Sequence, residues 1–255
     1  MIELKSKSEI EKMADSGKIL SEAMFEIRRM IRPGLHTIEL DKKAYEIITR
    51  SGARPTFLGY GPAGKAYPAS ACISVNEVVV HGIPGMRELR DGDIVGIDLG
   101  VTNKGYIADA AYTFAVGNIP EEVQEFLQIT ENSLYLGIDK FSLGNRLGDI
   151  SHAIQSYVES HGFSVVRDLT GHSVGKQLHE GLEVPNYGQS GKGVRLKEGM
   201  TLAIEPMINM GGWEVDFLPD GWTVVTRDRK LSAHYEHTVA LTADGPRILT
   251  EFNWD

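Results

Sequence analysis

The chain has 255 residues, of which 42% are hydrophobic and 24% are charged, a composition typical of a soluble globular protein with a buried core. The formal net charge of −9 argues against a nucleic-acid-binding surface, which requires clustered Lys and Arg side chains. A single cysteine, Cys72, excludes an internal disulfide framework, and no apolar run approaches the roughly 18 residues of a membrane span. We therefore expect a cytoplasmic protein with no direct nucleic-acid binding and no membrane contact.

Helical patterns dominate the start of the chain. Ser8 and Glu11 fit a capping box, and apolar residues follow at helical spacing up to the Pro-Gly pair at residues 33–34. A second helix is predicted over residues 37–50. The Gly- and Pro-rich stretch at residues 59–70 is predicted to be a loop.

The rest of the chain alternates between strands and helices. Two further helices are predicted, the first opened by Pro120 and the second over residues 147–162. Because each half contains helices and strands and no linker separates them, we expect a single α+β domain made of two related halves, residues 1–120 and 121–255. The predicted strands lie at residues 71–82, 93–101, 105–116, 164–169, 200–210, 223–226 and 233–242.

A doubled motif supports the two related halves. The stretch LRDGDIVGIDLG, which starts at Leu89, nearly recurs as LKEGMTLAIEPM, which starts at Leu196. Both copies read as a Gly turn followed by a strand, and each ends an apolar run with a carboxylate, Asp98 in the first and Glu205 in the second. If a pseudo-two-fold axis relates the halves, these two acids meet near that axis.

Two more carboxylates lie inside predicted strands, Asp109 in GYIADAAY and Glu236 in SAHYEHTVALT. A lone buried acid is more often a structural residue with hydrogen-bond partners, because an unpaired charge is costly to bury. Four carboxylates that converge in an apolar site repel one another unless cations lie between them. The set of acids therefore predicts a metal site, most economically one with two ions bridged by carboxylates.

Histidines add candidate imidazole groups. His172 and His179 lie seven residues apart in TGHSVGKQLHEG, and the glycines around them argue against a helical HExxH arrangement. This spacing leaves open which of the two binds metal and which faces the substrate, and His81 at a predicted strand end is a third candidate. We expect His237 to point away from its strand neighbour Glu236. The remaining histidines are expected to be structural or exposed, namely His36, His152, His161 and His234.

Taken together, these segments resemble the type I methionine aminopeptidase family, which has the pita-bread fold. The motifs VNEVVVHGIPG, DGDIVGIDLG, GYIADAAYTF, GHSVGKQLHE, LAIEPMIN and AHYEHTVALT occur in the family's order and span nearly the whole chain. The resemblance implies two pseudo-symmetric halves around a mixed or antiparallel curved sheet. It also implies a hydrolase that removes the N-terminal methionine of nascent proteins when the next residue is small.

The resemblance implies a role for each site residue. Two divalent ions (Co, Mn, Fe or Zn) would have five protein ligands, Glu205 would also shuttle a proton, and His81 and His179 would contact the substrate. A methionine pocket would lie beside them, although the loop at residues 59–70 is longer than in the compact family form. The implied ligands are Asp98, Asp109, His172, Glu205 and Glu236, and the implied pocket residues are Tyr60, Tyr67, Cys72, Trp222 and Leu178, the last where the family often has Phe.

Two alternatives remain open at this point. A prolidase or Xaa-Pro aminopeptidase would share the fold and the metal ligands, but those relatives usually carry a separate N-terminal domain. A non-catalytic pita-bread protein that binds peptides would generally have lost metal ligands, and none of the five is lost here. For the main interpretation we expect the substrates to be N-termini of nascent polypeptides, with transient proximity to the ribosome, and we expect a monomer.

Overall fold

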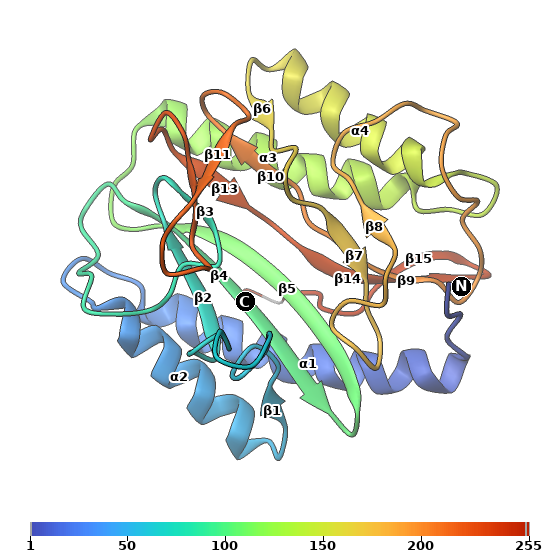
Figure 1. Cartoon of the computed structure of the whole chain (residues 1–255), viewed down its shortest axis with the longest axis horizontal. Coiled ribbons are helices and arrows are strands. Elements are labelled where there is room, and N and C mark those ends of the chain that lie inside the picture. The colour runs from blue at the N-terminus through green and yellow to red at the C-terminus, as the bar shows by residue number, and fades with distance from the viewer. Residues whose placement is uncertain (1, 253, 255) are drawn as a thin grey trace.

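The computed structural model describes residues 2–252 and 254. Within that part of the chain, two pairs of helices pack against antiparallel sheets, which confirms the predicted α+β class. Figure 1 shows one helix pair along each side of the strands, with the long hairpin of the first half running between them. The helices are α1 (Lys7–Met30), α2 (Thr37–Arg50), α3 (Glu121–Lys140) and α4 (Leu147–Ser160).

Most strands are short, and only two are ten residues long. The strands are β1 (Arg54–Pro55), β2 (Ala71–Val75), β3 (Val78–Val80), β4 (Ile94–Asn103), β5 (Tyr106–Ala115), β6 (Ser164–Val165), β7 (Gly171–Ser173), β8 (Glu183–Val184), β9 (Thr201–Ile204), β10 (Met207–Asn209), β11 (Val215–Phe217), β12 (Val224–Thr226), β13 (Ser232–His234), β14 (His237–Thr242) and β15 (Gly245–Ile248).

The hairpin of β4 and β5 is the centre of the first sheet. The two strands pair antiparallel along their whole length, and β2 and β1 pair with the other edge of β4. The largest sheet of the second half has the order β15–β14–β9–β7–β8, again with antiparallel neighbours. There are two smaller three-stranded sheets among the described residues, β13–β10–β6 and β11–β12–β3. The second one connects the halves, because β3 comes from the first half and β12 from the second.

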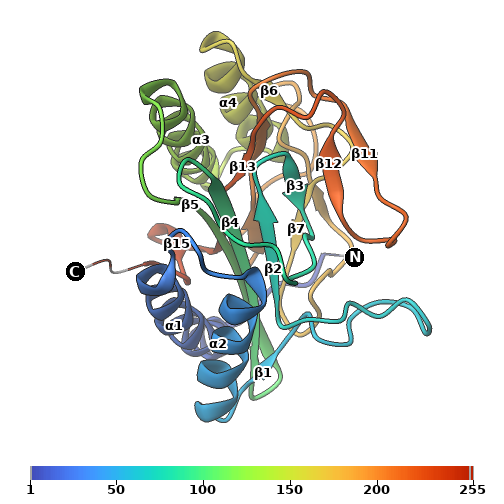
Figure 2. The same ribbon diagram turned by 90° about the vertical axis from the view of Figure 1, so that its left-hand side faces the viewer.

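Each helix pair buries its apolar face against one sheet. Leu20 of α1 and Ile47 of α2 share a core with Ile97 of β4, whereas Phe126 of α3 shares a second core with Leu202 of β9. Burial of these side chains is the main favourable term that holds the helices on the sheets. Figure 2 shows α1, α2 and α3 on one side of the strands, with the loop before β2 and the β11–β12 hairpin projecting on the other.

Two predicted strands are broken at their carboxylates. The predicted strand over residues 200–210 consists of β9 and β10, separated by Glu205 and Pro206. Proline has no N–H to donate, so the ladder cannot continue through this position. The predicted strand over residues 233–242 likewise consists of β13 and β14, with Glu236 in the break. Both acids of the second half therefore lie where the chain leaves one sheet for another.

The start of α1 differs from the prediction. Its N-cap is Ser6, whose hydroxyl accepts a hydrogen bond from the Glu9 backbone N–H, while the Glu9 carboxylate accepts one from the Ser6 N–H. The same spacing occurs at Ser8 and Glu11, but Glu11 forms an ion pair with Arg247 instead. The predicted helices that begin at Thr37 and after Pro120 are confirmed, as is the fourth. Over the residues described, no helix combines the length and apolarity needed to cross a membrane.

We predict that Gly17→Ala lowers the free energy of unfolding by about 1–3 kcal/mol, although Ala has the higher helix propensity. Gly17 of α1 lies against the backbone of the C-terminal segment, and an added Cβ would overlap the carbonyl oxygen of Leu249. Urea denaturation followed by circular dichroism measures the change. In Gly85→Ala the added Cβ meets no atom within 4 Å, so this control should change stability by less than about 0.5 kcal/mol. Equal losses in both variants would contradict the close contact at Gly17.

Candidate metal centre and substrate cavity

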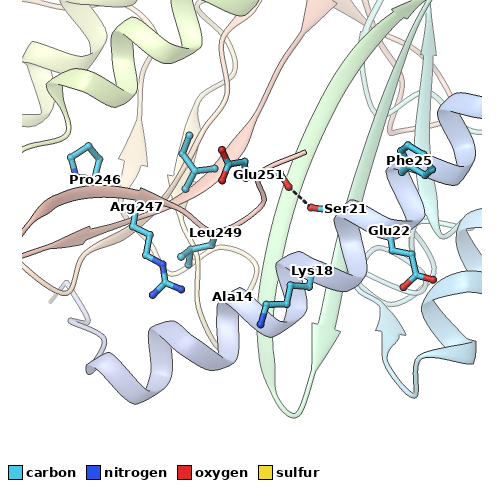
Figure 3. A pocket seen from close by; sticks show the side chains of 10 residues that line it. Ala14, Lys18, Ser21, Glu22, Phe25, Pro246, Arg247, Leu249 and Glu251 are labelled. Atoms are coloured by element: carbon cyan, nitrogen blue, oxygen red, sulfur yellow. Dashed lines mark hydrogen bonds between the residues drawn. The ribbon is translucent and has the colours of Figure 1, made fainter. Parts of the chain in front are cut away.

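Two cavities differ sharply in chemistry. A surface groove of about 720 Å³ lies between α1 and the C-terminal segment (Figure 3). There the Ser21 hydroxyl donates a hydrogen bond to the carbonyl oxygen of Glu251, and the charged Lys18 and Arg247 are exposed and each paired with an acid. The groove therefore gathers no buried set of reactive groups.

The second cavity, of about 460 Å³, collects every site residue predicted from the sequence. Ile97 and Leu99 pack in the core beneath α1 and α2, so Asp98 between them faces the opposite side of β4, where this cavity lies. The predicted residues that line it are Tyr60, Tyr67, Cys72, His81, Asp98, Asp109, His172, Leu178, His179, Glu205, Trp222 and Glu236.

The first two acids are placed by the register of the β4–β5 hairpin. Asp98 lies opposite Ala111, and Asp109 lies opposite Gly100, so the two acids are diagonal neighbours on the same face. Because Gly100 has no side chain, Thr56 and Phe57 can pack closely against it, whereas an added Cβ would overlap both residues. The hairpin thus carries two carboxylates to one place on the cavity floor.

The other two acids come from the strand breaks of the second half. β9 pairs with β14, and in this pairing Ile204 lies opposite His237. Glu205 and Glu236, the adjacent residues, therefore lie at the same end of this strand pair. Backbone hydrogen bonds in both directions between Glu236 and Ala111 join this end to β5. The breaks in the strands therefore let the second half meet the hairpin at the acids.

His172 of β7 reaches the same centre. Its Nε2 lies 3.4 Å from Oε1 of Glu205 and 3.7 Å from Oδ2 of Asp109, while its Nδ1 lies 3.3 Å from the Ser173 carbonyl oxygen. A carbonyl oxygen only accepts, so Nδ1 carries the proton and Nε2 presents its lone pair to the acids. This is the tautomer that a metal-binding imidazole needs.

Burial raises the pKa of all four acids. It raises the pKa of Asp98 to about 7, and burial followed by the charge of Asp98 raises the pKa of Asp109 well above its ordinary value. Burial also raises the pKa of Glu205 and, together with the charge of Asp109, that of Glu236. A cation among them would favour the ionised forms and reverse these shifts.

The residues present fit a metal centre. Oδ1 of Asp98, Oδ1 of Asp109 and Oε1 of Glu236 are buried and have no hydrogen-bond partner among the described residues. One candidate ligand atom from each of Asp109, His172 and Glu236 lies within 4.8 Å of the others. An oxygen-rich set with one imidazole suits hard or borderline divalent ions, which would satisfy these oxygens directly.

His179 lies at the cavity wall, beside the metal centre. Its Nδ1 lies 2.5 Å from the Tyr60 hydroxyl, and its ring centroid lies 4.2 Å from that of His172. The next residue, Glu180, anchors this loop, since its carboxylate pairs with the buried Lys5 and accepts a hydrogen bond from the Lys176 N–H. The N-terminal segment before α1 thus helps to fix the position of His179.

His81 is held in a strained backbone conformation. Its φ of 58° lies in the left-handed region, which is unfavourable for a residue with a Cβ, and such strain clusters at functional sites. The following Gly82 is required by a close approach, because an added Cβ would overlap the Ile73 carbonyl oxygen. Burial, with the charges of His234 and His179, lowers the pKa of His81 to about 4, so the ring is neutral near pH 7.

An apolar pocket lies next to the acids. Cys72 of β2 pairs with Asp98 in the β2–β4 ladder, and burial raises the pKa of its thiol. The Tyr67 and Trp222 rings meet edge to face at 5.2 Å, and Leu178 belongs to the same buried cluster as Tyr67 and Cys72. The loop at residues 59–70 reaches this wall, because the Trp222 indole N–H donates to the Lys65 carbonyl oxygen at 3.0 Å.

One histidine lies closer to the acids than expected. His234 was expected to be structural or exposed, but it is buried with Nε2 3.6 Å from Oε2 of Glu205, which brings its ring to the acid cluster. It lies in the same strand pattern as Glu236, two residues before it, and that same-side spacing was the available signal. His237 does point away, since its Nδ1 bonds to Thr250. His152 is exposed on α4, and His161 is exposed at the C-cap of that helix.

Other cavity residues carried no sequence signal. Phe57, Val80, Leu169, Leu182 and Met207 add to the apolar lining. Asp168 and Thr170 also line the cavity. Apolar residues in strands and loops are ordinary core positions, so only the fold reveals that these side chains face a cavity.

Comparisons with known proteins agree with this geometry. The sequence profile described as metallopeptidase family M24 matches residues 11–243. A methionine aminopeptidase of Clostridium perfringens is 56% identical over 251 residues, covering 98% of this chain and 99% of that protein. Crystal structures of methionine aminopeptidases from Thermotoga maritima and Rickettsia prowazekii match with TM-scores of 0.95, at 45% and 40% identity, and each match covers 98% of this chain and 100% of the other. The likeness confirms the predicted fold.

The raised pKa values predict that metal binding releases protons. A cation binds ionised carboxylates, whereas Asp98 with its pKa of about 7 is largely protonated in mildly acidic solution. His172 contributes no proton, because burial and the charge of His179 lower its pKa to about 3. The Mn²⁺ affinity of metal-depleted protein should therefore rise from about pH 5 and continue to rise through pH 7, because the pKa values of Asp109, Glu205 and Glu236 are raised as well. Calorimetric titration near pH 6 in two buffers of different ionisation enthalpy measures the released protons, and binding without release would contradict the shifts.

Proposed function

The chain belongs to metallopeptidase family M24, and on this premise we propose that it is a metal-dependent methionine aminopeptidase. It would remove the N-terminal methionine from polypeptides whose second residue is small. The observation that carries the proposal is the convergence of four acids, two buried and two partly buried, and His172 beside an apolar pocket in one cavity. The metal centre would hold the α-amine of the substrate, and the neighbouring pocket would hold a flexible apolar side chain. This arrangement suits cleavage after a single N-terminal Met.

We propose that Asp98, Asp109, His172, Glu205 and Glu236 hold two divalent ions of Co, Mn, Fe or Zn. Asp98 would bind one ion and His172 the other, with Asp109 and Glu236 shared between them. The bound ions would supply a water of lowered pKa and polarise the scissile carbonyl. The unpartnered oxygens of three of these acids and the tautomer of His172 support this arrangement.

The remaining chemistry falls to side chains of this chain. The Glu205 carboxylate would take the proton from the attacking water and deliver it to the leaving amine. His179 would donate from Nε2 to the carbonyl oxygen as negative charge develops there, and His81 would donate on the amide-nitrogen side. The Tyr60 hydroxyl beside Nδ1 of His179 supports this role, because a proton donated to Nδ1 leaves Nε2–H free to face the substrate.

The methionine side chain would enter the apolar pocket. Tyr67, Cys72, Leu178 and Trp222 offer an apolar wall with a polarisable thiol, which suits a flexible thioether. Tyr60, on the longer loop, lines the same cavity and would close its mouth.

Substrates would be the N-termini of nascent polypeptides, met close to the ribosome in the cytoplasm, and the enzyme would work as a monomer. The single thiol of Cys72, buried and free of any disulfide, supports a reducing compartment.

The alternatives receive less support. Identity of 56% with a methionine aminopeptidase over nearly the full length of both chains favours that activity over a prolidase or Xaa-Pro aminopeptidase. A non-catalytic peptide-binding protein would have no need to keep four costly buried acids and an imidazole together.

Asp98→Asn or Glu205→Gln should abolish turnover while the protein stays folded, because each change removes a ligand charge and the second also removes the base. Metal content by atomic absorption and hydrolysis of Met-Ala-Ser test this together. Full activity at the metal content of the unaltered protein, in either variant, would rule out the assigned centre.

His179→Ala should keep most of the bound metal but lose about 10²-fold or more in turnover, the effect expected when one oxyanion donor is removed. The same two measurements separate the roles of His172 and His179. A collapse of metal occupancy in His179→Ala would show that this residue is a ligand.

Substrate preference tests the proposed function directly. Met-Ala-Ser should be cleaved much faster than Met-Leu-Ser, because an oversized second side chain clashes with the cavity edge, and faster than Leu-Ala-Ser, because Leu branches where Met is flexible. Rates are compared at equal metal load, with an Ala-Pro peptide as the prolidase control. Comparable rates for the three tripeptides would refute a methionine-specific enzyme, and preferential cleavage of Ala-Pro would favour the prolidase alternative.

A further inference from the structure

His234 is a buried imidazole at the metal centre that the proposed mechanism does not use. Its side chain is 5% exposed, and its Nε2 has no hydrogen-bond partner among the described residues. The backbone of His234 is fixed by Thr113 of β5, whose hydroxyl accepts from the His234 N–H and donates to the His234 carbonyl oxygen. The ring is therefore fixed at a defined place and directed at the acid cluster.

Glu205 lies between two imidazoles that approach different oxygens of its carboxylate. His172 Nε2 lies 3.4 Å from Oε1, and His234 Nε2 lies 3.6 Å from Oε2. His172, which approaches Oε1, belongs to the candidate metal-binding group with Asp109 and Glu236, and His234 does not. Nε2 of His172 therefore faces the candidate metal centre, whereas Nε2 of His234 faces the other oxygen of the Glu205 carboxylate.

The two imidazoles need opposite tautomers. Nδ1 of His172 donates to a backbone carbonyl oxygen, so its Nε2 presents a lone pair. Nε2 of His234 is buried, has no hydrogen-bond partner among the described residues, and faces Oε2 of Glu205. A lone pair on Nε2 would add repulsion to an already crowded set of acids, whereas an N–H facing an ionised carboxylate forms a charge-assisted hydrogen bond. The proton therefore belongs on Nε2, and a small rotation of the Glu205 side chain closes the 3.6 Å gap.

We infer that His234 is a positioning residue that donates from Nε2 to Oε2 of Glu205 and so holds Oε1 toward His172 and the metal. The main chain of Glu205 is held as well, because the Asn186 side-chain amide donates to the Glu205 carbonyl oxygen at 2.9 Å. The strand break at Glu205 leaves this residue without regular ladder partners. The contacts with Asn186 and His234 take their place. The inference rests on the proposed metal centre, but its first readout needs no peptide.

The experiment compares His234→Gln with His234→Asn in the full chain. The Gln amide reaches about as far as imidazole Nε2 and can donate to Glu205, whereas the Asn amide is one methylene shorter and cannot. His152→Gln, on the exposed face of α4, is the matched control. Each metal-depleted variant is titrated calorimetrically with Mn²⁺ for affinity and stoichiometry, then assayed for kcat and KM with Met-Ala-Ser, and its melting temperature is recorded. If His234→Asn fails to fold, His234→Leu, which also lacks the donor, takes its place.

His234→Asn should keep the stoichiometry of the unaltered protein but lose about 10-fold or more in Mn²⁺ affinity or kcat, as is usual when a partner of a metal ligand is removed. His234→Gln should recover most of the loss, and His152→Gln should show none. Unchanged affinity and kcat in His234→Asn would overturn the inference, as would a Gln variant as impaired as Asn. Loss of one bound ion would overturn it too, since His234 would then be a ligand. If no variant, nor the unaltered chain, cleaves the peptide while the affinity differences persist, the proposed function fails and the positioning role stands.

Discussion

The convergence of four buried or partly buried carboxylates in one cavity is the constraint on which the rest of the structure depends. Each such charge costs several kcal/mol to desolvate and repels the others, and the raised pKa values of Asp98, Asp109, Glu205 and Glu236 express that cost. Hydrogen bonds within the chain do not relieve it, because oxygens of three of these acids have no partner among the described residues. Divalent cations among the acids would relieve this desolvation cost and repulsion, which explains why a stable chain keeps the four acids together.

The architecture keeps the acids close although nothing in the chain neutralises them. The apolar cores under the two helix pairs hold the β4–β5 hairpin and the β9–β14 pair, so much of the stabilisation lies away from the cavity. The acids lie where the β4–β5 hairpin meets the β9–β14 pair, next to the backbone hydrogen bonds between Glu236 and Ala111. Asp98, Asp109 and His172 lie on strands, which position side chains more accurately than loops do.

The sequence revealed the acids, the helices and the class of fold, because each leaves a local signal. Period-2 patterns around Asp98 and Asp109 and the doubled motif identified the carboxylates, and the cavity gathers all of the predicted side chains. What the sequence could not reveal depends on backbone geometry: the strand breaks at Glu205 and Glu236, the positive φ of His81, and the approach of His234 to Glu205. The capping box of α1 was misplaced because two overlapping Ser-x-x-Glu spacings are locally equivalent, and only the tertiary pairing of Glu11 with Arg247 separates them.

Anomalous diffraction at the manganese edge, from crystals of the chain loaded with Mn²⁺, tests the central claim most directly. If the four acids are buried together to hold cations, the anomalous difference map will show two peaks among the carboxylates of Asp98, Asp109, Glu205 and Glu236, one of them beside Nε2 of His172. A cavity without a peak at saturating Mn²⁺, or peaks confined to surface acids, would contradict the account.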